Sequence, residues 1–304
     1  MINPILPMLA TSAPPFDSFE HLFEIKWDGV RALAAVEGGH WRLWGRELVD
    51  YSGRYPELEV LRRLPSGTVV DGELVVLQND RPSLSALQRR HHLVRPDRIR
   101  HASQHTPIRY VLFDILAHRG RSLVREPLYR RRCVLTDLFI ELDEPLFVFS
   151  EGRVGLGQDF FAQAVAQGHE GVMAKHQASR YLPGQRSSAW RKIKPVQLLP
   201  CVIIGYTPAR DGLHSLLVAT AHQGGIRYVG QVTGLPGRTK TELSQRLAQH
   251  RRRQPIVACP HKALWVEPEV YCRVQFLRWT PHGRLHGASF RGLLDDRARE
   301  DGGR

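Results

Sequence analysis

Short alternations of apolar and polar residues near the start of the chain predict strands joined by tight turns. Residues 23–36 have strand spacing on both sides of Asp28-Gly29, a dipeptide that commonly forms a two-residue hairpin turn. Further strands are expected at residues 41–44 and 69–77. We therefore expect antiparallel strands at the start of the chain, with residues 23–36 forming the first hairpin.

The middle of the chain mixes helical and strand patterns. Residues 84–90 have helical spacing and a basic character, and residues 158–166 are again helical. Residues 110–116 form a nearly continuous apolar run, which is typical of a buried strand, and residues 171–175 are strand-like. This irregular alternation favours an α+β fold over a doubly wound parallel sheet.

A segment bracketed by prolines, residues 195–200, has no clear pattern and is predicted to be a linker. One helix is expected beyond it, where Thr239 and Glu242 have capping-box spacing. Short strands surround that helix, at residues 201–206, 216–221, 226–232 and 270–276. This combination fits a small OB-fold β-barrel. We therefore expect two domains, residues 1–197 and residues 198–304.

The charge of the chain is unevenly distributed. The formal net charge is +13, but residues 1–150 hold 20 basic and 19 acidic side chains, whereas residues 151–304 hold 23 and 11. A strongly basic half indicates a polyanionic partner, most commonly nucleic acid. The alternative is an arginine-rich chain with a solvated basic surface.

Other features of the composition point to the cytoplasm. No run of about 18 apolar residues is present, so no membrane contact is expected. The first twenty residues lack the pattern of a secretory signal. The four cysteines have no zinc-type spacing and are expected to be ordinary reduced thiols.

Lysine is rare in this chain, and that makes each lysine a candidate for chemistry. Lysine can lose its proton and act as a nucleophile, whereas arginine cannot. Of the 43 basic residues only six are lysines, Lys26, Lys175, Lys192, Lys194, Lys240 and Lys262.

Several short motifs follow one another in an order that suits one reaction. The first is Lys26-Trp27-Asp28-Gly29, which alone could be a hairpin turn with a solvent-facing lysine. Asp71-Gly72-Glu73 comes next, and could equally be a twisted edge strand with solvated acids. Phe113 could be plain core packing. The last segments are residues 170–175 and 186–194, and a solvated basic strand is the alternative for the latter.

Together these residues suit transfer of a nucleotide to a lysine. Lys192, Lys194 and a divalent cation near Lys26 would favour its neutral amine, which could attack the α-phosphate of a nucleoside triphosphate. Glu73 and Glu170 are suited to holding Mg²⁺, a hard ion that prefers oxygen ligands.

The motifs resemble those of the covalent nucleotidyltransferase superfamily, and they follow one another in the same order as in that superfamily. The similarity is closest to bacterial ATP-dependent DNA ligases of the end-joining type, including the ligase module of multidomain enzymes that work with Ku. It extends from residues 7–10 to residues 290–293. The resemblance implies a nucleotidyltransferase (ATP-grasp-like ligase) domain followed by an OB-fold barrel, with ATP and Mg²⁺ or Mn²⁺ as cofactors.

The resemblance also implies a role for individual residues. Lys26 would be the adenylated nucleophile. Glu24 and Phe113 would contact adenine. Arg31 and Arg46 would contact the sugar, a phosphate or the DNA end.

The remaining roles concern charge. Glu73 would bind the ribose or the metal, and Glu170 would bind the metal. Arg186, Lys192 and Lys194 would hold the phosphates.

The implied reaction has three steps: AMP moves from ATP to lysine, then to a 5′-phosphate end, and a 3′-hydroxyl displaces it. The implied substrate is nicked or broken double-stranded DNA, and a Ku-type end-binding protein and a separate polymerase are candidate partners. A cytoplasmic, nucleoid-associated monomer is expected. Two alternatives stay open: an RNA ligase or other covalent nucleotidyltransferase, and a non-catalytic DNA-end-binding module.

The last motif departs from the family pattern. Leu294 stands where the family has an arginine that orients the departing pyrophosphate. The resemblance therefore implies slow self-adenylation unless another arginine substitutes. The candidates are Arg297, Arg291 and Arg284.

Overall fold

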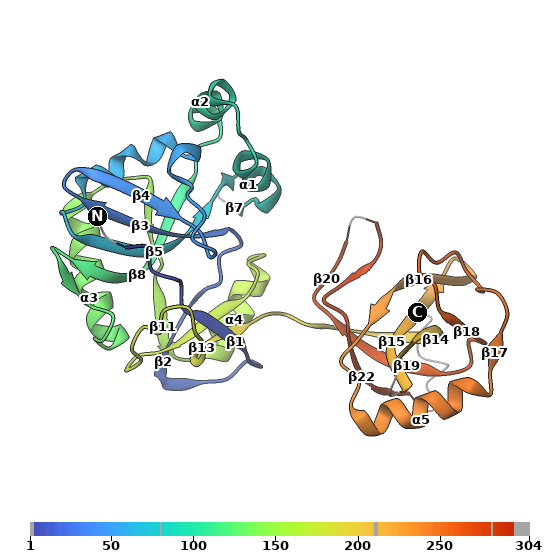
Figure 1. Cartoon of the computed structure of the whole chain (residues 1–304). Coiled ribbons are helices and arrows are strands. Elements are labelled where there is room, and N and C mark those ends of the chain that lie inside the picture. Colours follow the sequence, from blue (N-terminus) through green and yellow to red (C-terminus); the bar gives the residue numbers. More distant parts are fainter. Residues whose placement is uncertain (1–2, 80, 210–211, 281, 295–304) are drawn as a thin grey trace. The chain divides into compact units, whose positions relative to one another are not determined.

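The computed structural model describes residues 3–79, 81–209, 212–280 and 282–294. The chain forms two compact units, Met1–Lys194 and Pro195–Arg304, which are here called unit 1 and unit 2 (Figure 1). The break follows Lys194, whereas the sequence placed it after residue 197. Strand β14, Gln197–Ala209, occupies most of the segment that was expected to be a linker.

Unit 1 contains two sheets of five principal strands each. The first sheet has the order β1 (Leu9–Ser12), β13 (Arg186–Ile193), β12 (Val172–His176), β2 (Ser18–Ile25) and β11 (Gly152–Gly155). The second has the order β10 (Phe147–Phe149), β8 (Arg109–His118), β5 (Thr68–Val75), β3 (Val30–Glu37) and β4 (His40–Trp44), and β9 (Arg121–Ser122) also pairs with β8. Most neighbouring strands are antiparallel, which agrees with the expected α+β class.

Helices and short turns cover the outer faces of these sheets. Helix α3 (Leu128–Leu142) packs against β8, and α4 (Gly157–Ala166) packs against β2 and β12. The helical elements are η1 (Ser52–Arg54), η2 (Pro56–Arg63), α1 (Leu84–His91), α2 (Pro96–His105), α3 (Leu128–Leu142) and α4 (Gly157–Ala166), and the short strands β6 (Leu77–Gln78) and β7 (Arg81–Pro82) pair before α1. Between the sheets lies a buried cluster to which both contribute, including Leu33 and Phe113 from the second sheet and Trp190 from the first. This cluster fixes the two sheets against one another.

The predicted hairpin at residues 23–36 is wrong. Strand β2 pairs with β11 and β12 in the first sheet, whereas β3 pairs with β4 and β5 in the second. The segment Lys26–Gly29 therefore connects the two sheets. A Cβ atom on Gly29 would lie 2.2 Å from the carbonyl oxygen of Leu74, so this glycine permits a close approach to β5.

Unit 2 is the OB-type barrel that the sequence predicts. Strands β14, β15 (Gly212–His222) and β16 (Gly225–Val232) form a meander. Strand β14 also pairs with β18 (Leu264–Val266) and β19 (Tyr271–Phe276), and β22 (Ser289–Leu293) pairs with β19. A parallel bridge between Thr233 and Ser289 joins the end of β16 to β22 and closes the barrel. After β14, the elements are β15 (Gly212–His222), β16 (Gly225–Val232), α5 (Gly237–Ala248), β17 (Arg251–Arg252), β18 (Leu264–Val266), β19 (Tyr271–Phe276), β20 (Arg278–Trp279), β21 (Leu285–His286) and β22 (Ser289–Leu293).

The predicted capping box is wrong, although the helix exists. Helix α5 begins at Gly237, after Pro236 as its N-cap, and Thr239 lies inside its first turn. The preceding proline fixes its own φ near the helical value, and the helix starts three residues earlier than the side-chain pattern implies. Within the described residues, none of the helices has the length and apolar character needed to cross a bilayer.

Candidate active site

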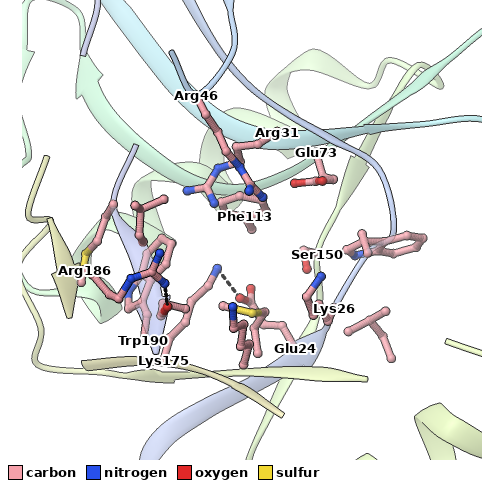
Figure 2. A pocket seen from close by; sticks show the side chains of 17 residues that line it. Glu24, Lys26, Arg31, Arg46, Glu73, Phe113, Ser150, Lys175, Arg186 and Trp190 are labelled. Carbon is pink, nitrogen blue, oxygen red and sulfur yellow. Dashed lines mark hydrogen bonds and ion pairs between the residues drawn. The ribbon is translucent and has the colours of Figure 1, made fainter. Parts of the chain in front are cut away.

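A pocket in unit 1 collects most of the residues that the sequence singles out (Figure 2). Eight of the ten predicted site residues line it, namely Glu24, Lys26, Arg31, Arg46, Glu73, Phe113, Arg186 and Lys192. The other two, Glu170 and Lys194, join it through Lys26. The sequence-distant motifs therefore come together at one place, where side chains of the two sheets face one another.

Lys26 follows the end of β2 and is held by its backbone and by its side chain. Its N–H group donates to the carbonyl oxygen of Gly171 at 2.9 Å. Its Nζ donates to the carboxylate of Glu170, which also accepts from Lys194. All three side chains are 20–26% exposed, so substrate can reach them.

Glu170 lies between Lys26 and Lys194, which were expected from the sequence to be direct neighbours. Burial opposes ionisation of Glu170, but the ammonium groups of Lys26 and Lys194 outweigh this and hold the pKa of the carboxyl below its usual value. Lys192 lines the pocket separately, and burial together with the nearby Lys194 lowers the pKa of its ammonium group. An ionised acid is thus the immediate partner of Lys26.

Glu24 lies two residues before Lys26 on β2 and is almost fully buried. Its carboxylate forms ion pairs with Lys175 of β12 and with Arg132 of α3, the latter at 2.9 Å. Figure 2 shows Lys175 directed toward Glu24 across the floor of the pocket. Burial lowers the pKa of Lys175, and the Glu24 charge opposes that shift. Glu24 is 1% exposed and Lys175 2%, so this pair is shielded from solvent.

The second sheet supplies the facing wall of the pocket. Arg31 of β3 donates two hydrogen bonds to Asp71 of β5, at 2.5 and 2.6 Å, and Tyr181 donates to the same carboxylate at 2.6 Å. This network fixes the Arg31 guanidinium over the Phe113 ring, with 4.6 Å between its central carbon and the ring centroid. The network therefore holds the Arg31 guanidinium group in one position on this wall.

Glu73 is the acid of this wall and lies opposite Arg31 in the register of β3 and β5. Burial raises the pKa of Glu73 to about 7, against the opposing effect of nearby cations, of which Arg31 and Lys26 are the strongest. The neighbouring Gly72 has no room for a side chain, because a Cβ atom there would lie 2.4 Å from the carbonyl oxygen of Val111. This explains the glycine between two acids in the sequence motif.

Trp190 is a pocket residue that the sequence reasoning missed. Its ring meets Phe113 edge-on with 6.3 Å between centroids, and the Lys175 Nζ lies 4.1 Å from the Phe113 centroid and 4.6 Å from that of Trp190. Alternation along β13 could have found it, since Trp190 shares a strand face with Arg186 and Lys192. Met173 and Lys175 share a face of β12 in the same way, and Ser150, which follows β10, carries no such signal.

The acids of the pocket fit a metal that takes only part of its ligands from protein. The described residues contain no group of three His, Cys, Asp or Glu side chains placed to hold a metal ion. Glu73 is nonetheless a partly buried carboxylate that a cation would keep ionised, and Glu170 already balances two ammonium groups. Mg²⁺ is commonly held by one or two carboxylates together with substrate phosphates, and this pair fits that pattern.

Comparisons with known proteins agree over nearly the whole chain. Residues 7–194 match the family model described as "ATP dependent DNA ligase domain", and residues 209–297 match "ATP dependent DNA ligase C terminal region". The chain is 32% identical over 309 residues to the multifunctional non-homologous end joining DNA repair protein LigD of Mycobacterium tuberculosis, covering 96% of this chain and 39% of that protein. It is also 32% identical to LigD of Pseudomonas aeruginosa, covering 97% of this chain and 36% of that protein.

Among solved structures, the mycobacterial DNA ligase D complexed with ATP and MES is 32% identical, with a TM-score of 0.57, and the similarity covers 96% of this chain and 95% of that one. The chain thus spans about two fifths of the curated LigD proteins it matches, and nearly all of a solved ligase chain.

Proposed function

The chain belongs to the ATP-dependent DNA ligase family, and from this membership we propose that it seals breaks between 5′-phosphate and 3′-hydroxyl ends of DNA through a covalent adenylate on Lys26. The observation that carries the proposal is the position of Lys26. It follows the end of β2 within a pocket lined by Glu73, Phe113 and five further cationic side chains, one of them Lys192. One of the few lysines of the chain thus lies where a triphosphate would bind.

In the first step the Lys26 ammonium group loses a proton to solvent, its Nζ attacks the α-phosphorus of ATP, and the nitrogen then releases a second proton. A nitrogen–phosphorus bond forms while the bond from the α-phosphorus to the bridging oxygen of the β-phosphate breaks, and pyrophosphate leaves. Such transfers depend on in-line positioning and on cations placed at the developing charge. We assign that charge stabilisation to Arg186, Lys192 and Lys194.

The walls of the pocket suit the rest of the nucleotide. Glu24 and Phe113 are proposed to contact adenine, since Phe113 offers a ring within the pocket and Glu24 offers an acceptor fixed by two cations. Arg31 and Arg46 are proposed to contact the sugar, a phosphate or the DNA end. Both lie on the facing wall, where Figure 2 shows their guanidinium groups pointing into the pocket.

Mg²⁺ or Mn²⁺ would be held by Glu73 and Glu170. The ion would supply charge stabilisation to the phosphates of the substrate. Glu73 is also the candidate to bind the ribose. Lys26 and Lys194 donate to different carboxylate oxygens of Glu170. When Lys26 is neutral, the oxygen that it contacts is therefore available to a metal.

The later steps use the same pocket with DNA as the second substrate. An oxygen of the 5′-phosphate attacks the adenylate phosphorus, the nitrogen–phosphorus bond breaks, and Lys26 regains a free amine. The 3′-hydroxyl then attacks the 5′-phosphorus, the new phosphodiester forms, and AMP leaves. The proton of the hydroxyl passes to solvent or to AMP.

The relatives suggest the setting of this reaction. LigD proteins are described as acting in non-homologous end joining and DNA repair, so we propose broken or nicked duplex DNA as the substrate. A Ku-type end-binding protein and a separate polymerase are the proposed partners, and the proposed location is the bacterial cytoplasm at the nucleoid, as a monomer. RNA joining is the alternative, which a comparison of nicked DNA with nicked RNA would separate.

The test of the proposal is labelling with α-³²P ATP and Mg²⁺. The protein should acquire an acid-labile label, and both Lys26→Ala and Lys26→Arg should abolish it, because arginine keeps the charge but is not a nucleophile. Lys262→Arg, an exposed lysine of unit 2, serves as the matched control and should label normally. A label that survives in either Lys26 variant would remove Lys26 from this role.

A further inference from the structure

One basic surface of unit 1 takes no part in the pocket. Helices α1 and α2 and the turn between them, residues 84–105, are here called the two-helix element; Figure 1 shows it in teal, outside both sheets. It contains five arginines, four histidines and a single acid, Asp97. The rest of residues 1–150 holds 15 basic and 18 acidic side chains. The near-neutral charge of this half of the sequence therefore conceals a local concentration of cations.

The cations of the element fall into two groups with different surroundings. Arg90 is 2% exposed and forms an ion pair with Glu57 of η2 at 2.9 Å, and Arg95 pairs with Asp97. Arg89, Arg98 and Arg100 are exposed, and within the described part of the chain none of them forms an ion pair, although Arg98 lies close enough to Asp97 to interact with its charge. Only the second group is available to an external anion.

The element is held rigidly at its base. Besides the pair with Arg90, Glu57 accepts from the backbone N–H of Ile108 at 3.3 Å, and Arg54 donates to the carbonyl oxygen of His91 at 3.1 Å. Helix α2 packs on η2 and buries Ile99. A charged surface in a fixed position loses little conformational entropy when it binds a partner.

The exposed cations of α2 lie on the side away from the core. Arg98, His101 and His105 follow the i, i+3, i+7 spacing of one helix face, while Ile99 faces inward and Arg100 lies at the other flank of the exposed side from Arg98. At 1.5 Å per residue, residues 98–105 extend over about 10 Å. Phosphates of one DNA strand recur about every 3.4 Å along the duplex axis, so this face matches a run of about three.

We propose that the two-helix element is a binding surface for the phosphate backbone of duplex DNA, in which Arg89, Arg98 and Arg100 contact phosphates. This rests on the proposed function, because it assigns part of the DNA-binding energy to unit 1 outside the pocket. Phosphate contacts of this kind position the protein on the duplex and carry no sequence preference. The surface therefore acts in DNA binding and takes no part in adenylation.

The test is the salt dependence of binding to a fluorescent nicked duplex. Each lost phosphate contact lowers the slope of log affinity against log salt by about 0.9. The triple variant Arg89→Gln, Arg98→Gln, Arg100→Gln should therefore have a slope shallower by about 2.7. Between 50 and 200 mM salt the unaltered protein should lose about 40-fold more affinity than this variant.

A matched control removes three exposed arginines from another part of unit 1, namely Arg119→Gln, Arg121→Gln, Arg125→Gln. It changes the net charge equally and should leave the slope within about 0.9 of the original. Equal effects of the two triple variants would overturn the proposal, since net charge alone would then explain the loss. An unchanged slope in the first variant would overturn it as well.

Self-adenylation of the same variants separates this proposal from the proposed function. Labelling from α-³²P ATP should be unchanged in the Arg89, Arg98 and Arg100 variant, which also shows that unit 1 is folded. If the unaltered protein labels and seals nicks while the variant keeps the full salt slope, only the surface assignment fails. If the unaltered protein neither labels nor binds DNA, the proposed function itself fails.

Discussion

Arg132 is a residue whose importance the sequence does not reveal, because it lies on α3 outside the pocket. Its guanidinium group pairs with Glu24 at 2.9 Å and donates to the backbone carbonyl oxygens of Phe113 at 3.2 Å and Ser150 at 2.6 Å. These three partners all line the pocket and come from different strands or loops. The two terminal nitrogens of a planar guanidinium group hold such separate acceptors in a fixed geometry, whereas the three donors of an ammonium group all radiate from one atom. We infer that Arg132 is a positioning residue for the base-binding wall.

The first prediction is that Arg132→Lys weakens ATP binding about 10- to 100-fold, which corresponds to losing one charge-assisted hydrogen bond of about 1.5–3 kcal/mol. The concentration dependence of self-adenylation measures this. The loss should be smaller with a purine riboside triphosphate, which lacks the amino group proposed to meet Glu24. Arg130→Lys, an exposed neighbour on α3, is the control and should change neither value. Equal losses with both nucleotides would indicate a purely structural role.

At the residue scale the sequence predicted the charged members of the pocket better than its aromatic ones. Lys26, Glu73 and Glu170 stand out because their types suit chemistry wherever they occur. Trp190 did not, since a tryptophan in a strand is usually core, and it is indeed 1% exposed. The position of Glu170 between Lys26 and Lys194 could not be predicted either, because it depends on how the end of β2 meets the segment before β12.

At the scale of elements, one buried arginine fastens α3 to the second sheet of unit 1 and to the loop that follows β12. Arg131 donates two hydrogen bonds to Asp114 of β8, at 2.7 and 2.8 Å, and further bonds to the carbonyl oxygens of Glu126 and Ser179. Both charged side chains are 0% exposed. Since Arg132 is the next residue, the same anchor sets the position from which α3 supports the pocket.

The second prediction is that Arg131→Leu lowers the free energy of unfolding by about 3–5 kcal/mol, because it leaves the Asp114 carboxylate buried without its partner. The midpoint of urea denaturation, followed by near-ultraviolet dichroism, measures the change. Asp114→Asn in the Arg131→Leu background should recover part of the loss, since it removes the unpaired charge. Arg130→Ala breaks an exposed ion pair and should cost less than about 1 kcal/mol. A loss for Arg131→Leu no larger than that for Arg130→Ala would contradict the anchor.

Most elements were predictable from sequence, but their partners were not. The apolar run at residues 110–116 became β8 and the helical spacing at 158–166 became α4. The hairpin at Asp28-Gly29 failed because a turn signal is local, whereas strand pairing is decided by packing over long sequence distances. That error concerned the segment that carries Lys26. A nucleophile at a crossing between two sheets can be reached from the pocket, whereas a hairpin tip would lie at one sheet edge.

At the scale of the whole molecule, the two units have separate cores. The clusters that contain Leu112, Trp190 and Phe23 lie within unit 1, and those that contain Val274 and Ile204 lie within unit 2. Unit 1 also holds every residue of the pocket. We therefore propose that ATP binding and the nucleophile belong to unit 1, and that unit 2 contributes mainly to the steps that require DNA.

The third prediction is that a fragment of residues 1–197 binds ATP but seals nicks at least 100-fold more slowly than the full chain. Fluorescence titration with an ATP analogue and gel assays of nick closure measure the two properties. The basic excess of residues 151–304 gives the physical reason, because much of the phosphate-binding charge is lost with unit 2. Sealing by the fragment at the full rate would show that the division of labour is wrong.

The last prediction concerns Leu294, at the end of β22. The resemblance assigns the arginine that usually stands here to the departure of pyrophosphate. Of the possible substitutes, Arg284 donates to the carbonyl oxygen of Tyr228, and its guanidinium carbon lies 4.3 Å from the centroid of the Tyr228 ring. Arg291 donates to the side-chain oxygen of Gln275 at 2.5 Å. Arg297, with Asp295 and Asp296, lies outside the described residues. Two of the three candidates are therefore already bound within unit 2.

We therefore expect slow self-adenylation but normal closure of a pre-adenylated nick, since the latter step expels no pyrophosphate. A fixed cation at a developing charge is commonly worth about 10²–10³ in rate. Leu294→Arg should recover a large part of that factor, because Leu294 is only partly buried and is held by its backbone N–H, which donates to Tyr271 at 2.9 Å. Two single-turnover assays measure the outcome, one for attachment of AMP to Lys26 and one for nick closure. Leu294→Lys is the control for charge without the guanidinium fork. If Leu294→Arg left AMP attachment unchanged, another arginine already assists the departure of pyrophosphate, and Arg297 is the nearest in sequence. If Leu294→Arg accelerated nick closure as much as AMP attachment, the new side chain would act on DNA binding instead.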